Sequence, residues 1–149
     1  VANIAVKAEA STWEPQEFFV PGEIELQSIG CRIKSWRQPS SLMTDSITPS
    51  TKFTSRDPMV AFFDEDTFAL PLTIRPWQAG DVFCPMGMGG KRKKLQDYFV
   101  DMKVPQYLRT QIPLIVASEG ILWIPGYRQD ERFQARSTTN RPCIMQLMR

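Results

Sequence analysis

The sequence predicts an α+β fold with a mostly antiparallel, sandwich-like β-sheet core and two short helices that follow a Gly-rich basic loop. The first observation is a series of short segments in which apolar and polar residues alternate, which is typical of half-buried strands. The second is helical spacing of apolar residues in two segments between residues 95 and 112. The third is composition, because 149 residues with 42% hydrophobic and 23% charged side chains are typical of one globular domain.

The first half of the chain predicts three strands and one long loop. Residues 23–27 and 29–33 each alternate between apolar and polar positions, and a turn near residues 28–30 separates them. Residues 59–63 are a short apolar run, which predicts a buried strand. Residues 38–58 are rich in Ser, Thr, Pro and Asp, and we expect them to form a flexible loop.

The second half predicts both helices and the remaining strands. Leu95, Phe99 and Met102 recur at near four-residue spacing, which predicts a helix directly after the basic loop. Pro105 suits the first turn of a second short helix, because its missing N–H needs no partner there. The further strands are expected at residues 70–75, at 114–117 and 121–124 as a hairpin, and at 143–148.

The residue types present exclude several kinds of catalysis. The chain contains no histidine, so Ser-His-Asp and Cys-His nucleophiles and histidine-dependent zinc sites are absent. Cys31, Cys84 and Cys143 stand far apart, which suggests neither a disulfide framework nor a metal site and favours the reducing cytoplasm. We therefore predict no catalytic residue and no metal ligand in this chain.

Charge is distributed unevenly along the chain. Residues 1–74 contain six basic and ten acidic residues, a formal charge of −4. Residues 75–149 contain twelve basic and six acidic residues, a formal charge of +6. Such asymmetry is typical of proteins that bind a polyanion, and the alternative is a solvated surface of mixed sign.

The most informative segment is the loop at residues 86–94. Its glycines, Gly87, Gly89 and Gly90, allow backbone N–H groups to approach an anion closely, and the basic run 91–94 follows them. The spacing fits neither a Walker A loop nor the dinucleotide-binding fingerprint. Four consecutive cations attract phosphate backbones without reading sequence, and the alternative is a solvated basic helix start.

Residues 72–133 resemble the C-terminal domain of bacterial tRNA(Ile)-lysidine synthetases. The order and spacing of many short pieces carry this resemblance. The sequence departs from the family pattern at Ala79, where proline is usual, and at Gln96, where a basic residue is common. The matching pieces are Leu72-Thr73-Ile74-Arg75, Gly80-Asp81, Pro85-Met86-Gly87-Met88, Lys93-Lys94-Leu95, Asp97, Phe99, Asp101-Met102-Lys103-Val104-Pro105, Arg109, Ile112-Pro113, Trp123-Ile124-Pro125-Gly126, Arg128, Asp130 and Arg132-Phe133.

The resemblance implies a domain organisation and a function. Residues 1–70 would be a β-rich segment that precedes the family motif, and residues 71–149 the tRNA-binding domain; we leave open whether the two form one compact unit. The family's whole enzyme is an ATP-dependent ligase that joins lysine to the wobble cytidine of an isoleucine tRNA with a CAU anticodon. Its catalytic domain carries a Ser-Gly-Gly-x-Asp-Ser loop that this sequence lacks. ATP and magnesium would therefore bind that N-terminal catalytic domain, and no cofactor is expected in this chain.

The partners implied are that tRNA and the catalytic domain of the same polypeptide, and the location implied is the cytoplasm. The alternative function is a structural module whose basic surface docks on the acidic surface of the catalytic domain. We expect Asp97 and Asp130 to orient basic residues through ion pairs, and the three loop glycines to shape the loop. The expected RNA-binding residues are Arg75, Lys91, Arg92, Lys93, Lys94, Arg109, Arg128 and Arg132.

Overall fold

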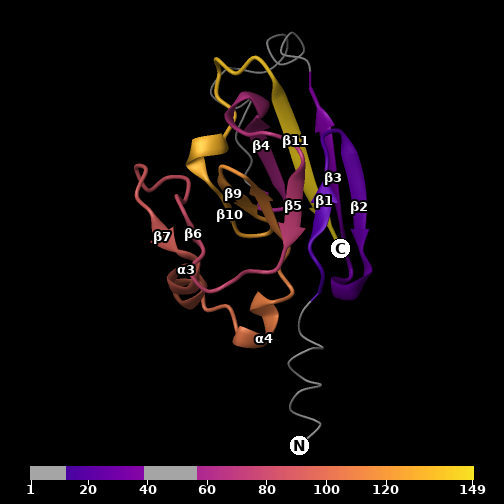
Figure 1. The fold of residues 1–149 in the computed structure, drawn as a ribbon. Helices are drawn as coiled ribbons and strands as arrows, with labels where there is room; N and C mark the ends of the chain where they lie inside the picture. Colours follow the sequence, from indigo (N-terminus) through magenta and orange to yellow (C-terminus); the bar gives the residue numbers. More distant parts are fainter. Residues whose placement is uncertain (1–12, 39–56) are drawn as a thin grey trace, which may run out of the picture.

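The computed structural model describes residues 13–38 and 57–149, which form two packed β-sheets with a helical layer on one side (Figure 1). The first sheet has five antiparallel strands in the order β1-β5-β8-β9-β10. These strands are β1 (Gln16–Phe18), β5 (Leu72–Arg75), β8 (Leu114–Ala117), β9 (Gly120–Ile124) and β10 (Arg128–Gln129).

The second sheet has four antiparallel strands in the order β2-β3-β11-β4. They are β2 (Gly22–Leu26), β3 (Cys31–Arg37), β4 (Val60–Asp64) and β11 (Pro142–Met148). The short strands β6 (Val82–Phe83) and β7 (Lys93–Lys94) pair separately. The remaining elements are the helices α3 (Leu95–Asp101) and α4 (Gln106–Arg109) and the 3₁₀ turns η1 (Gln27–Ile29), η2 (Glu65–Thr67) and η3 (Glu131–Phe133).

The main core lies between the two larger sheets. Along β3, Cys31 and Ile33 are buried while Arg32 and Lys34 are exposed, as the alternating sequence predicts. On β9, a bulge opposite the Ile115/Val116 step interrupts this alternation. The buried side chains of this core include Phe18, Leu26, Cys31, Ile33, Phe63, Leu72, Ile74, Ile115, Leu122, Trp123, Cys143, Met145 and Leu147.

A second core lies on the other face of the five-stranded sheet, beneath α3. Phe99 and Leu95 of the helix are fully buried there. They pack with Leu114 and Ile124 from the sheet. Because helix and sandwich cover opposite faces, β8 and β9 are buried on both sides, and the loop before α3 is held beside this layer (Figure 1).

The structure confirms the predicted fold class, and it differs from the sequence prediction at the ends of both helices. Met102 was expected on the buried face of the first helix but is 44% exposed, because the backbone turns at Lys103, where φ is +57°. The second helix ends at Arg109, well before residue 112. Proline at 113 disfavours helical backbone at Ile112, so the helix cannot extend to that residue.

Strand pairs cross the predicted boundary at residue 70. β1 pairs with β5, and β11 pairs with both β3 and β4. The strands of the first half and the last strand of the chain therefore form common sheets. The flexible loop predicted at residues 38–58 lies almost entirely outside the described residues.

Candidate nucleic-acid interface

The Gly-rich loop connects β6 to β7, and its base is fixed to β10 and η3. The backbone N–H of Met86 donates to the carbonyl of Gln129 at 3.0 Å. The carbonyl of Cys84 accepts from the N–H of Glu131 at 2.9 Å. The loop therefore projects from a rigid base beside the five-stranded sheet.

The three glycines of this loop all have positive φ. The values are +91° at Gly87, +66° at Gly89 and +83° at Gly90, a region that side chains disfavour. A Cβ at Gly87 or Gly89 would meet no atom within 4 Å. Backbone conformation, and not lack of space, is therefore the reason for glycine at these two positions.

The basic run divides into one paired and three solvent-facing cations. Lys93 forms an ion pair with Asp101 at the end of α3. Lys91, Arg92 and Lys94 are exposed, and among the described residues no carboxylate lies within ion-pair distance of them. Adjacent residues of a strand point to opposite sides, which explains why Lys93 and Lys94 differ.

A hollow of about 160 Å³ lies between this loop and α3. Lys93 and Arg128 both contribute to its lining, so the fold brings together two predicted RNA-binding residues that are distant in sequence. The guanidinium carbon of Arg128 lies 5.9 Å from the ring centroid of Tyr98, in cation–π range. The hollow is lined by Pro85, Met88, Lys93, Tyr98, Asp101, Met102 and Arg128.

Tyr98 is a feature of this hollow that the sequence analysis did not single out. Its side chain is 3% exposed, and its ring packs edge-on against Phe83. The hydroxyl is buried and has no hydrogen-bond partner in the described part of the chain. Burial raises the pKa of Tyr98, an effect that the positive charge of Arg128 partly opposes, so the phenol is neutral near pH 7.

Asp130 and Arg132 form a bidentate ion pair at the base of the loop. Asp130 is fully buried, and its oxygens lie 2.8 Å and 3.0 Å from Nη2 and Nε of Arg132. The same carboxylate accepts from the backbone N–H groups of Cys84 and Arg132, each at 2.8 Å. Hydrogen bonding to Asp130 raises the pKa of Arg132, whose side chain is 45% exposed. Asp130 therefore fixes the direction of a partly exposed guanidinium.

Two other predicted RNA-binding residues also have protein partners. Arg75 forms two hydrogen bonds of 3.0 Å with Asp81, and its side chain is only 15% exposed. Arg109 donates from Nε to the carbonyl of Val104 at 2.9 Å and lies over the ring of Phe99. Asp81 was noted only as part of a family motif, and no spacing signal in the sequence marks it as the partner of Arg75.

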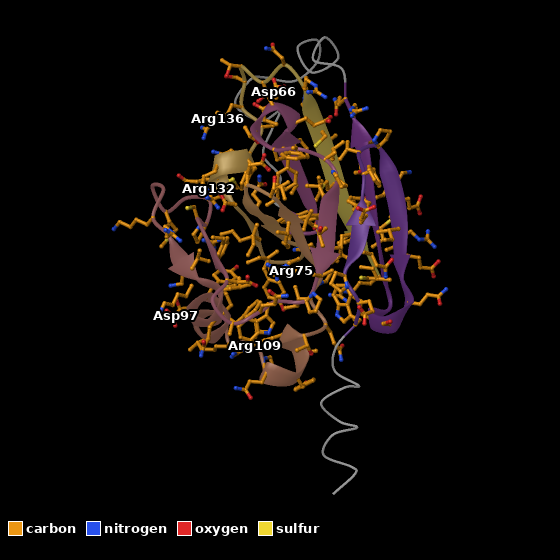
Figure 2. All side chains as sticks on the ribbon, viewed as in Figure 1. Asp66, Arg75, Asp97, Arg109, Arg132 and Arg136 are labelled. Carbon is orange, nitrogen blue, oxygen red and sulfur yellow. The ribbon has the colours of Figure 1, made fainter. Side chains whose placement is uncertain are left out.

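The predicted site residues do not gather at one place. Arg109 is the last residue of α4, whereas Arg132 lies toward the other end of the molecule, and Arg75 lies between them (Figure 2). Asp97 is exposed on the first turn of α3, and within the described residues it forms no ion pair. Among the described residues, Asp97 therefore has no basic side chain to orient, whereas Asp130 orients Arg132.

Across residues 13–38 and 57–149, no group of three or more Cys, Asp or Glu side chains is arranged to hold a metal ion. None of the helices in these ranges is long and apolar enough to cross a membrane.

Comparison with known families identifies residues 72–144 as a match to the model described as the TilS substrate C-terminal domain. The chain is similar to proteins named tRNA(Ile)-lysidine synthase. It is 39% identical over 89 residues to that of Parabacteroides distasonis, 29% over 127 residues to that of Caldanaerobacter subterraneus subsp. tengcongensis, and 34% over 120 residues to that of Symbiobacterium thermophilum. These alignments cover 60%, 85% and 80% of this chain but 20%, 25% and 23% of the relatives, so the chain spans about a quarter of their length or less.

Two solved structures share the fold. A crystal structure of a TilS C-terminal domain superposes with a TM-score of 0.70 at 24% identity, covering 91% of this chain and 97% of that chain. An N-terminal fragment of the phenylalanyl-tRNA synthetase β-subunit from Pyrococcus horikoshii superposes with a TM-score of 0.50 at 21% identity, covering 62% of this chain and 29% of that chain. At these identities the likeness concerns the fold.

Proposed function

Residues 72–144 belong to the TilS substrate C-terminal domain family, as the sequence resemblance predicted, and on that premise we propose that this chain binds tRNA for a tRNA(Ile)-lysidine synthase. The observation that carries the proposal is the anchored Gly-rich loop, which presents Lys91, Arg92 and Lys94 to solvent, where they form no ion pair with any described residue. Cations that the fold does not use internally are available for phosphate.

The shape of duplex RNA supports this role. A double-stranded stem exposes phosphates and 2′-hydroxyls, while its narrow major groove hides the base edges from side chains. A loop with several cations on a rigid base recognises such a surface by charge and position alone. Arg128, which lies beside the loop without a carboxylate partner among the described residues, adds a fourth cation.

The chemistry of the whole enzyme forms the wider part of the proposal. The polypeptide would be an ATP-dependent ligase of the cytoplasm that converts the wobble cytidine of isoleucine tRNA with a CAU anticodon to lysidine. The catalytic domain would bind ATP and magnesium, and this chain would supply neither catalytic residue nor cofactor site. Its task would be to hold the tRNA while chemistry proceeds elsewhere.

A charge-matched pair of double variants tests the binding role. Lys91→Ala with Arg92→Ala removes two loop cations, and Arg32→Ala with Lys34→Ala removes the same charge from the outer face of β3 on the opposite side of the molecule (Figure 1). Affinity for an isoleucine tRNA transcript and a methionine tRNA transcript is measured across a salt series. Each lost phosphate contact makes the slope of log affinity against log salt concentration shallower by roughly 0.7–0.9. We therefore expect the slope of the loop variant to be shallower than that of the wild type by about 1.5.

The control variant should keep the wild-type slope, because its cations lie on the far sheet. Equal slopes for both double variants would remove the loop from the proposal. Failure of the wild-type chain to bind either transcript at low salt, together with salt-sensitive binding to the catalytic domain, would favour the docking module instead.

A further inference from the structure

The hollow between the Gly-rich loop and α3 has a chemical character that phosphate binding leaves unexplained. We propose that it binds the base of one unpaired nucleotide of the RNA, with the hydroxyl of Tyr98 bonded to an edge of that base. This inference rests on the proposed tRNA-binding function and extends it from backbone contacts to a single base. Three properties of the hollow carry it: its size, its unpartnered hydroxyl and its balance of charge.

The size and walls of the hollow suit one flat ring. Its volume is about 160 Å³, and an apolar cavity of roughly 150 Å³ is known to admit a benzene ring. Met88 and Met102 contribute unbranched thioether side chains that are 40% and 44% exposed. Such side chains adapt to an entering ring and contact its face. The hydroxyl of Tyr98 is buried in this structure, so the neighbouring side chains must rotate before a base can reach it.

The polar groups suit the edge and the face of a base. A buried hydroxyl without a partner costs free energy, and a native fold normally supplies a partner for it. Base edges carry both donors and acceptors, so a base supplies that partner when it enters. Arg128 already lies over the ring of Tyr98, and guanidinium planes stack on bases as they do on aromatic rings.

The carboxylate of Asp101 disfavours phosphate beside Lys93, although Arg128 gives the lining one further positive charge. Asp101 lines the hollow and pairs with Lys93, so the lysine in the hollow is already neutralised by a carboxylate. A phosphate placed there would face that carboxylate, whereas a neutral base would not. The backbone of the same nucleotide would meet the exposed Lys91, Arg92 and Lys94 at the edge of the loop.

The occupant must come from single-stranded RNA. Bases inside a duplex are stacked and paired, and proteins read individual RNA bases mainly in loops, bulges and ends. A tRNA offers such nucleotides at its single-stranded 3′ end and in its loops. The hollow would therefore bind an unpaired base from a helix end or a loop, next to the duplex whose phosphates the cations contact.

The substitution Tyr98→Phe removes the hydroxyl and leaves the ring packing. Because that hydroxyl has no partner, the free energy of unfolding should stay equal or rise. The matched control is Tyr107→Phe, which removes the hydroxyl of a residue on α4 that is 72% exposed. The probes are a blunt RNA duplex, the same duplex with a short 3′ overhang, and the same duplex closed by a hairpin loop, each bound to the whole 149-residue chain.

We expect the wild-type chain to bind one of the two RNAs with unpaired nucleotides more tightly than the blunt duplex. Tyr98→Phe should lower the affinity for that RNA by roughly three- to tenfold, as loss of one hydrogen bond implies, and leave the affinity for the blunt duplex unchanged. The RNA that responds identifies the end or the loop as the source of the base. Equal wild-type affinity for all three RNAs would overturn this inference and leave the proposed function standing. Binding to none of them would overturn both.

Discussion

Replacing Asp130 with alanine probes how the loop is attached to the sandwich. The carboxylate is fully buried and accepts from the N–H of Cys84, from the N–H of Arg132 and from the guanidinium of Arg132. Alanine removes all of these contacts at once. It also frees the guanidinium of Arg132, which is 45% exposed and can be solvated by water.

The magnitude follows from the separate contacts. The buried N–H of Cys84 loses its partner, which costs about 1–3 kcal/mol. Asp130 also caps η3 through the N–H of Arg132, a contribution of about 1 kcal/mol. The ion pair adds less than about 1 kcal/mol, because the arginine is partly exposed. We therefore expect Asp130→Ala to lower the free energy of unfolding by about 3 kcal/mol.

The assays are urea unfolding and thermal unfolding of the chain, each followed by fluorescence and by circular dichroism. A loss of this size lowers the melting temperature of a domain of this length by roughly 6–12 °C. Asp97→Ala is the matched control, since Asp97 is exposed on α3 and its loss should cost less than about 1 kcal/mol. Equal effects of the two substitutions would refute the assignment of Asp130 as the anchor of the loop.

Two further predictions concern the backbone and the buried thiols. Lys103 holds a left-handed conformation after α3, where the N–H of Val104 donates to the carbonyl of Phe99 at 2.9 Å. Glycine suits that position, so Lys103→Gly should raise the free energy of unfolding by about 0.5–1 kcal/mol in urea titration, and a decrease would contradict the strain argument. Burial raises the pKa of Cys143 above its ordinary 9.0, so the folded state keeps the proton while the unfolded state loses it. The stability that this thiol contributes is complete well below pH 9 and falls as the pH rises, by about 1.4 kcal/mol at pH 10. The free energy of unfolding should therefore fall less between pH 8 and pH 10 in Cys143→Val than in the wild type. An equal fall in both proteins would show that this thiol is not the group that titrates.

The sequence predicts the strands whose faces differ and misses the elements that lack such a contrast. β3 alternates because one of its faces meets the core and the other meets water, and this pattern is visible without a structure. β9 is buried on both faces and carries a bulge, so its apolar run fits a strand but gives no register. The pair β6 and β7 has two residues in each strand, too few for any period to appear. Composition, and not periodicity, located the loop between them, because its glycines are followed by four consecutive basic residues.

The charged residues show most clearly why the number of cations available to RNA cannot be counted from sequence. Eight cations were predicted to bind RNA, and the fold gives four of them protein partners: Arg75, Lys93, Arg109 and Arg132. These partners come from a turn, a helix end, a backbone carbonyl and a buried aspartate, none of which a charge count detects. The remaining cations are Lys91, Arg92, Lys94 and Arg128.

Whether eight or four cations contact phosphate can be measured from the salt dependence of tRNA affinity. Eight phosphate contacts would give a log–log slope of roughly −6 to −7, whereas four would give roughly −3 to −3.5. A cation that already has a protein partner contributes less to RNA binding, because RNA must first replace that internal contact: a carboxylate for Arg75, Lys93 and Arg132, and a backbone carbonyl for Arg109. The shallower slope is therefore the value that this fold implies, although half of the chain carries a formal charge of +6.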